Sequence, residues 1–213
     1  TIIMAVNSGP DGIVQDGLIF YVDAANKESY PGSGTTATDL VGTSNGTISG
    51  ATFTNVDAGA WDFDGVDDNI DFGDIGFYSP QISISCWVYP SNNGHFIKYG
   101  SSGSNPLLWV HVHNNTDLRI YIRNVFRVFS SCITLNQWHY ITITRIDYNN
   151  GKVYVNGVSQ GDLIGTFADL SQTGNLVICD SLLGNAASYQ IYNKALSDKE
   201  VLQNYNALKG RFS

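Results

Sequence analysis

Short runs of alternating or β-branched residues recur along the whole chain, and Gly, Asn, Asp and Ser separate them. Short strands with polar turns between them are typical of an antiparallel β-sandwich. The sequence therefore predicts an all-β protein with about a dozen strands. The expected strands cover residues 18–23, 47–54, 60–63, 69–72, 82–89, 95–99, 107–113, 118–123, 125–133, 139–147, 152–155 and 175–179.

The segment 82–88 shows the alternation most clearly. Apolar residues occupy its even positions, and Ser83, Ser85 and Trp87 occupy its odd positions. Successive side chains of a strand point to opposite faces of the sheet, so the two sets face opposite ways. We expect one face of this strand to be buried more deeply than the other.

Two Asn-Gly pairs predict tight hairpins. Asn156-Gly157 lies between Val155 and Val158, and Asn-Gly tolerates positive φ at both central positions of a two-residue turn. By the same reasoning, Asn150-Gly151 is expected to close the preceding hairpin.

One helix is predicted, at 197–209. Ser197 and Glu200 have the spacing of a capping box, and Val201, Tyr205 and Leu208 follow at helical spacing. Such an amphipathic helix must pack on a sheet or on a neighbour. No internal repeat or linker divides the chain, so we expect a single domain over 1–213, with residues 1–16 as an N-terminal arm.

Charge and composition exclude several partners. The formal net charge is −8 and the chain has 11 Lys and Arg residues, which argues against nucleic acid because phosphate binding depends on those residues. A surface rich in Asn, Ser, Thr and Tyr suits neutral sugars, cations or proteins. No apolar run reaches membrane-spanning length, so membrane insertion is not expected. The three widely spaced cysteines are interpreted as buried apolar residues.

Three stretches resemble a known family. Residues 63–70, 82–90, and 138–145 together with 153–157 are similar in order and spacing to laminin-G-like, concanavalin A-like domains. The resemblance covers most of the chain. It implies a two-sheet antiparallel jelly-roll sandwich, here with one short C-terminal helix.

The two ends of the chain carry a narrower resemblance. Residues 16–36 and 191–212 are similar to the ends of such domains in bacteriophage virion proteins. This implies a surface-exposed tail-fibre or capsid component, assembled in the host cytoplasm, whose partners are other virion proteins and a host-surface polysaccharide. Because virions present symmetric copies and repeated weak sites gain affinity through avidity, we expect a homo-oligomer.

A cluster of aspartates is the densest acidic feature. Oxygen ligands around a glycine turn suit Ca²⁺, and we predict Asp64, Asp67 and Asp68 as ligands, with Asp23 completing the site. The alternative is a turn whose aspartates accept hydrogen bonds from their own backbone. In addition, the family's usual Asp shortly before residue 191 is replaced around Ala187. The full cluster comprises Asp62, Asp64, Asp67, Asp68, Asp71 and Asp74.

Histidines offer a second possibility for a metal. His111 and His113 are two residues apart on an expected strand, so both rings project from the same face and could chelate a borderline metal. The sequence shows no third ligand nearby, and exposed histidines without a metal are the commoner case. His139 is interpreted as a structural residue at the edge of the core.

Sugar recognition suits this composition better than catalysis does. Aromatic rings stack on the apolar faces of sugars, while amides and imidazoles bond to hydroxyl groups. The predicted sugar-binding residues are Tyr99, Trp109, His113, Asn114 and Asn115. The alternative for Trp109, as for Trp87 and Trp138, is packing within the core.

An inventory of carboxylates argues against an enzyme. Glycosidases need two close carboxylates, usually Glu in this fold, and the chain has only Glu28 in a loop and Glu200 in the capping box. We therefore expect a protein without catalytic activity, and the resemblance implies a role in adhesion to host-surface glycan or in decoration of the virion. Two alternatives stay open, namely a purely structural cementing protein and a glycoside hydrolase that uses the same-face pair Asp62 and Asp64.

Overall fold

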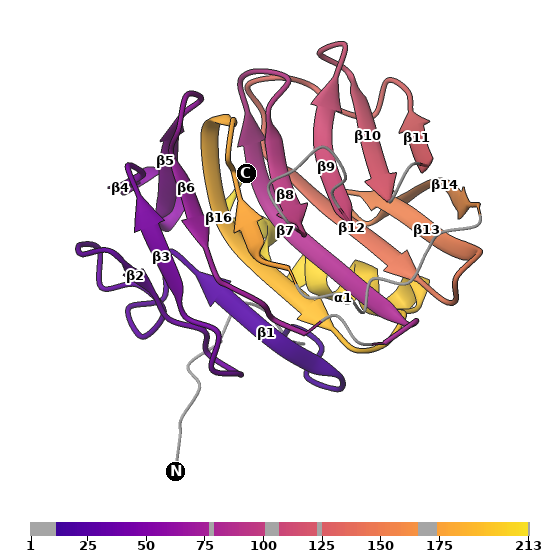
Figure 1. Cartoon of the computed structure of the whole chain (residues 1–213), viewed down its shortest axis with the longest axis horizontal. Helices are drawn as coiled ribbons and strands as arrows, with labels where there is room; N and C mark the ends of the chain where they lie inside the picture. Colours follow the sequence, from indigo (N-terminus) through magenta and orange to yellow (C-terminus); the bar gives the residue numbers. More distant parts are fainter. Residues whose placement is uncertain (1–11, 77–78, 101–106, 123–124, 166–173, 213) are drawn as a thin grey trace.

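The computed structural model describes residues 12–76, 79–100, 107–122, 125–165 and 174–212. Within them the chain forms two antiparallel sheets packed face to face, with one α-helix near the C-terminus (Figure 1). The predicted all-β sandwich with a short C-terminal helix is therefore confirmed. None of the helices in these residues is long and apolar enough to span a membrane.

The first sheet, sheet A, is built around two long strands, β7 and β16, which pair along most of their length. Its strand order is β14-β13-β12-β7-β16-β5-β4, and β1 also pairs with β16. The strands of sheet A are β1 (Leu18–Asp23), β4 (Thr52–Thr54), β5 (Ala60–Asp64), β7 (Ile82–Pro90), β12 (His139–Arg145), β13 (Asn150–Val155), β14 (Val158–Ile164) and β16 (Leu183–Tyr192).

The second sheet, sheet B, has the order β11-β10-β9-β8-β15-β6-β3-β2. Four of its strands, β8 to β11, form a consecutive meander at one end of the sheet (Figure 1). The strands of sheet B are β2 (Thr36–Ala37), β3 (Gly46–Ser49), β6 (Asn69–Asp71), β8 (His95–Tyr99), β9 (Leu108–His113), β10 (Asp117–Ile122), β11 (Val125–Phe129) and β15 (Leu176–Ile178). The helices are η1 (Val56–Ala58), α1 (Asp198–Leu208) and η2 (Lys209–Arg211).

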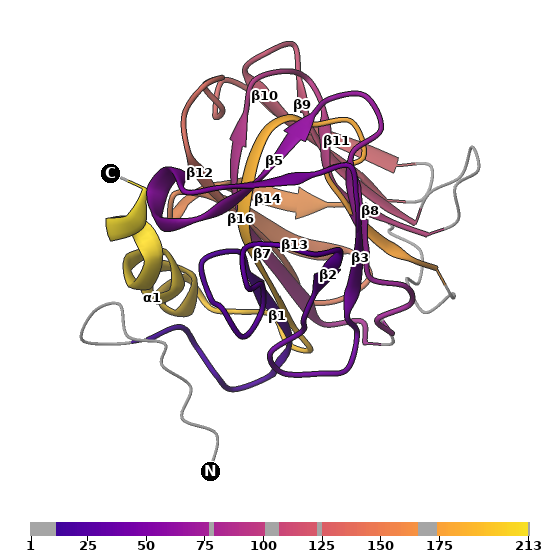
Figure 2. The ribbon, with the colours of Figure 1, turned by 90° about the vertical axis from the view of Figure 1, so that its left-hand side faces the viewer.

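The two faces of sheet A are buried by different partners. Its inner face packs on sheet B and contributes Ile84 and Val88 of β7 to the main core. Its outer face packs on α1, where Trp87 of β7 joins a second apolar cluster with Tyr140 and Val201. Figure 2 shows the helix on one side of sheet A and sheet B on the other. The expected difference in burial between the faces of β7 is therefore wrong, because the helix covers the Ser/Trp face.

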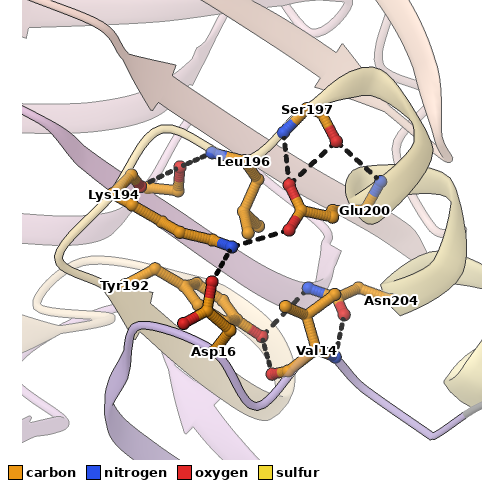
Figure 3. Close-up of polar contacts among 9 residues, drawn as sticks. Val14, Asp16, Tyr192, Lys194, Leu196, Ser197, Glu200 and Asn204 are labelled. Carbon is orange, nitrogen blue, oxygen red and sulfur yellow. Dashed lines mark hydrogen bonds and ion pairs between the residues drawn. The ribbon is translucent and has the colours of Figure 1, made fainter.

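Polar contacts hold the helix in place (Figure 3). The capping box is present, since the Ser197 hydroxyl accepts from the Glu200 N–H and the Glu200 carboxylate accepts from the Ser197 N–H. Glu200 also pairs with Lys194 at 2.7 Å. The fully buried Asn204 accepts from the Val14 N–H at 2.8 Å. The described part of the expected N-terminal arm is thus packed against the helix.

The strand boundaries differ from the prediction at several points, and the expected strand 125–133, for example, ends at Phe129. The expected strand 47–54 is two strands in different sheets, because the chain crosses from β3 to β4 at Gly50, which has φ +77°. A Cβ atom at Gly50 would collide with the Asp68 carboxylate, so only glycine fits this crossing. The prediction lacked β2 and β16 altogether, and it indicated β14 only through the hairpin turn before Val158.

The two Asn-Gly pairs have different roles. Asn156 and Gly157 have φ values of 53° and 77° and form the two-residue turn between β13 and β14, as predicted. By contrast, Asn150 and Gly151 are paired residues at the start of β13. The preceding turn lies at 146–149, where Asp147 accepts hydrogen bonds from the Asn149 and Asn150 N–H groups. The predicted turn at 150–151 is therefore wrong.

Candidate functional site

The outer face of sheet B lies opposite the face that packs in the core, and no described helix covers it (Figure 2). On β9 the residues alternate strictly in burial. Leu108, Val110 and Val112 are buried in the core, whereas Trp109 and His111 are half-buried on the outer face. The period of two in the sequence Leu-Trp-Val-His-Val-His therefore places one aromatic and two imidazole side chains on the same surface.

A row of rings crosses three strands on this face, and a lysine extends it onto a fourth. Strand pairing aligns Lys98 of β8 with Trp109 of β9, Trp109 with Tyr121 of β10, and Tyr121 with Phe126 of β11. The Trp109 and Tyr121 rings have centroids 5.9 Å apart, and the Lys98 ammonium lies 5.5 Å from the Trp109 ring. The Phe126 side chain is 50% exposed. We call Trp109, Tyr121 and Phe126 the aromatic row.

A second set of residues runs beside the aromatic row. Pairing aligns His95 with His111, His111 with Arg119, and Arg119 with Val128. The His95 ring lies 4.7 Å from the His111 ring and 5.0 Å from the Trp109 ring, centroid to centroid. The rings of His95, His111, Trp109 and Tyr121 are therefore neighbours in one continuous series.

Charges on this patch are unevenly compensated. Lys98 pairs with Asp180 at 2.6 Å, and His95 Nδ1 lies 2.9 Å from the Ser181 hydroxyl. Burial, with smaller contributions from the nearby His95 and Arg119, lowers the pKa of His111 to about 4, so the imidazole is neutral at pH 7. Among the described residues, three buried polar atoms of the patch have no hydrogen-bond partner, namely Trp109 Nε1, His111 Nδ1 and Asp180 Oδ1.

The predicted sugar-binding residues are only partly brought together. Trp109 and His113 lie on the outer face, as expected from their period. Tyr99 is fully buried in the core, so its ring cannot stack on a ligand, and this prediction needs correction. Asn114 and Asn115 are exposed at the β9–β10 turn, where their φ values of 51° and 66° explain why asparagine stands there.

The residues that the sequence analysis missed are Tyr121, Phe126 and Arg119. The period of two within 118–123 and 125–133 could have indicated that Tyr121 shares a face with Arg119, and Phe126 with Val128. However, sequence alone did not give the register that brings these residues beside Trp109.

The aspartate turn between β5 and β6 does bring three predicted metal ligands together. One carboxylate oxygen from each of Asp64, Asp67 and Asp68 lies within 4.8 Å of the others. The turn also uses these groups itself, since Asp64 accepts from the Val66 N–H at 2.8 Å and Asp68 from the Asp64 N–H at 3.0 Å. Burial raises the pKa of Asp68, and the charges of Asp64 and Asp67 add to the rise. Calcium binding here stays a prediction.

Asp23 does not belong to that turn. Its carboxylate is buried and binds Arg211 at 2.7 Å and the Tyr21 hydroxyl at 3.0 Å. Asp23 pairs with Ser188 of β16, whereas Asp64 pairs with Leu183, which lies five residues earlier in that strand. The proposed contribution of Asp23 to a metal site is therefore corrected, because the residue anchors the C-terminal segment.

His111 and His113 have no third metal ligand within reach among the described residues. The rings of His111 and His113 have centroids 6.2 Å apart, and the one group of three candidate ligands within reach of a single ion is the aspartate turn. His139 is buried, with Nε2 at 2.9 Å from the Thr134 carbonyl oxygen, in agreement with a structural role.

Comparisons with known proteins agree with the fold. A family model described as the concanavalin A-like lectin/glucanases superfamily matches residues 63–202. The comparison with curated proteins finds no match.

Solved structures resemble the chain over most of its length. A Trypanosoma rangeli sialidase in complex with sialic acid has a TM-score of 0.70 and 14% identity, covering 93% of this chain and 34% of that one. Domain 4 of AbnA, a GH43 extracellular arabinanase from Geobacillus stearothermophilus, in complex with arabinotriose, has a TM-score of 0.68 and 20% identity, covering 88% of this chain and 98% of that one. The binding domain of Paraclostridial Mosquitocidal Protein 1 has a TM-score of 0.72 and 17% identity, covering 90% and 52%.

The chain thus spans about a third of the length of the sialidases. At these identities the likeness shows the fold alone.

Proposed function

Because the chain belongs to the concanavalin A-like lectin/glucanase superfamily, we propose that it is a carbohydrate-binding protein without catalytic activity. The observation that carries this proposal is the aromatic row on the outer face of sheet B, aligned by strand pairing. Aromatic rings present flat apolar surfaces that match the C–H faces of sugars, and neighbouring polar groups orient the hydroxyls. The domain of the arabinanase that shares this fold is described in complex with arabinotriose, which supports a sugar ligand.

The geometry of the row suits a chain of sugars better than a single one. Neighbouring strands lie about 4.8 Å apart, so rings on three consecutive strands extend over about 10 Å. The row runs across the strands, and an extended glycan lying in that direction would meet one ring after another. His95 and His111 flank the row and can exchange hydrogen bonds with hydroxyl groups, since neutral imidazole both donates and accepts.

The distribution of carboxylates supports binding without hydrolysis. Glu200 is committed to the capping box and to Lys194, and Glu28 is exposed in the loop after β1. Neither lies on the outer face of sheet B. On that face Asp117 accepts from the Ser131 N–H at 2.9 Å, and Asp180 pairs with Lys98. A retaining or inverting glycosidase needs an acid and a second carboxylate placed on either side of the bond that is cleaved.

The test is binding to a glycan array by the protein multimerised on a scaffold, because shallow sites are weak one by one. We expect Trp109→Ala and Phe126→Ala to reduce binding by about tenfold or more, as removal of a stacked ring costs about 1–3 kcal/mol. The matched control is Tyr148→Ala, which removes a ring of similar exposure, 40%, outside the row. Equal loss in all three variants, or no binding to any glycan, would refute the proposal.

We also propose that the domain is displayed on the surface of a bacteriophage virion, as a homo-oligomer that adheres to host-surface glycan or decorates the particle. Support comes from the resemblance of residues 16–36 and 191–212 to such proteins and from the gain in avidity that symmetric copies give to weak sites. Electron microscopy of particles labelled with an antibody to this domain would test the placement, and label absent from intact particles would contradict it.

A structural cementing role is the second candidate. It is favoured by Phe126 and Val128, which are 50% and 39% exposed on the edge strand β11. Exposed apolar residues on an unpaired edge are typical of surfaces that join other proteins. The two roles separate in one comparison. Val128→Lys should disrupt assembly in a cementing protein, whereas a glycan-binding protein should keep its oligomeric state. New reducing ends after incubation with host polysaccharide would instead favour a hydrolase.

A further inference from the structure

Arg119 lies in the middle of the proposed glycan-binding face without a carboxylate partner. It is half-buried on β10, aligned with His111 on one side and Val128 on the other. Its guanidinium carbon lies 4.2 Å from the centre of the Phe126 ring, so the guanidinium group stacks on the aromatic row. No carboxylate of the described residues lies within ion-pair distance of it.

The acidic residues of the same face are already engaged. Asp180 pairs with Lys98, and Asp117 accepts hydrogen bonds from the Ser131 N–H and the Thr116 hydroxyl. The His111 imidazole, which is aligned with Arg119, is neutral at pH 7 and provides no negative charge to pair with the guanidinium group. Among the described residues, Arg119 is thus a cation of this face without an ion-pair partner and lies beside stacking surface, although the whole chain has a net charge of −8.

Guanidinium is the side chain best suited to hold a carboxylate. Its planar fork offers two parallel N–H donors that match the two oxygens of a carboxylate, and such charge-assisted bonds are about twice as strong as neutral ones. Stacking on Phe126 fixes the plane of the guanidinium before a ligand arrives, which lowers the entropic cost of binding. A sugar ring lying on the aromatic row would place a carboxylate substituent beside this fork.

We propose that the ligand of this face is an acidic glycan, in which a sugar carboxylate is held by Arg119 while the sugar rings stack on Trp109, Tyr121 and Phe126. This inference rests on the proposed function and narrows it. The expectation of neutral sugars came from the net charge of the whole chain. The local arrangement around Arg119 revises that expectation, because short-range pairing outweighs charges that lie beyond the Debye length of about 8–10 Å.

The experiment compares each acidic polysaccharide with its own uncharged form. The probes are polygalacturonate, alginate and hyaluronan, each immobilised beside a sample in which the carboxyl groups have been reduced to alcohols, and dextran sulfate serves as a polyanion without carboxylates. We expect at least one acidic form to bind about tenfold or more tightly than its reduced form, and more tightly than dextran sulfate.

Variants of Arg119 identify the group responsible. Arg119→Gln should lose the preference for the acidic form and keep binding to the reduced form, because the aromatic row is intact. Arg119→Lys keeps the charge but not the fork, so it should recover only part of the preference. The matched control is Lys27→Gln, which removes one positive charge from an exposed position outside this face. Thermal melting of each variant confirms that it is folded.

The outcomes separate the two proposals. Equal binding to acidic and reduced forms, or equal binding to dextran sulfate, overturns the acidic ligand and leaves carbohydrate binding in place. An unchanged preference in Arg119→Gln also overturns it. Binding only to neutral glycans of a wider array likewise overturns the acidic ligand and leaves carbohydrate binding in place. Absence of binding to every glycan, charged or neutral, overturns the proposed function itself.

Discussion

Asn204 connects the helix, the strand β16 and the N-terminal segment, and its replacement by alanine tests how the helix is held on sheet A. The Asn204 Oδ1 atom accepts from the Val14 N–H at 2.8 Å, and its Nδ2 atom donates to the Tyr192 hydroxyl at 3.0 Å (Figure 3). The Tyr192 hydroxyl in turn donates to the Val14 carbonyl oxygen at 3.1 Å. All three residues are buried, so water cannot replace the lost side chain without a rearrangement.

The magnitude follows from the two lost hydrogen bonds. Leaving the buried Val14 N–H without an acceptor costs about 2 kcal/mol, and loss of the bond to Tyr192 costs about 1 kcal/mol. The better helix propensity of alanine returns about 0.5 kcal/mol. For a chain of this size a net loss of about 2.5 kcal/mol lowers Tm by about 5–10 °C.

Thermal unfolding followed by circular dichroism at pH 7 measures this change. The matched control is Asn206→Ala, the same substitution two residues further along α1 at an exposed position, which gains only helix propensity. We expect the control to melt at the wild-type temperature or slightly above it. Equal Tm values for Asn204→Ala and Asn206→Ala would refute the claim that the buried amide stabilises the docked helix.

Two further predictions concern titration and calcium. The pKa of His111 is about 4 in the folded protein against 6.5 when unfolded, so the stability from the neutral ring is present above pH 6.5 and is lost as the pH falls towards 4. After allowance for partial exposure, the stability lost on acidification amounts to about 1 kcal/mol. The Tm of His111→Gln should therefore fall less between pH 7 and 4.5 than the Tm of wild type. Equal falls in Tm would contradict the lowered pKa of His111. If Asp64, Asp67 and Asp68 bind calcium, about 10 mM CaCl₂ should raise Tm of wild type by several degrees and EDTA should reverse it, whereas Asp67→Asn should not respond. The same Tm with and without calcium would remove the predicted metal site.

The sequence predicted strands well where burial differs between their faces or where turns are strongly marked. The strand at Leu108–His113 alternates between buried and half-buried residues, and the capping box at Ser197 marks the start of the helix. The longest strand, Leu183–Tyr192, escaped prediction because both its faces are buried, one by sheet B and one by the helix. Its Ser188 and Gln190 are fully buried polar residues, so neither apolar alternation nor an apolar run marks the strand.

The sequence predicted only part of the candidate site, because tertiary packing decides which of its residues become neighbours. Trp109 and His113 are four positions apart on one expected strand, and an even spacing places both side chains on the same face. Their neighbours Tyr121 and Phe126 lie 12 and 17 positions after Trp109, and their proximity depends on the register of two hairpins. A shift of that register by one residue would turn either ring into the core. Register follows from tertiary packing, so the site emerges only with the fold.

The packing of Ile13, Val14 and Phe212 against the helix also determines how the domain would be presented to its surroundings. Both described ends of the chain leave from the helix side of sheet A, whereas the aromatic row lies on the far side of sheet B. A tether attached at either end would therefore hold the domain from the helix side of sheet A, opposite the aromatic row. The rings would face away from the point of attachment, towards whatever surface approaches.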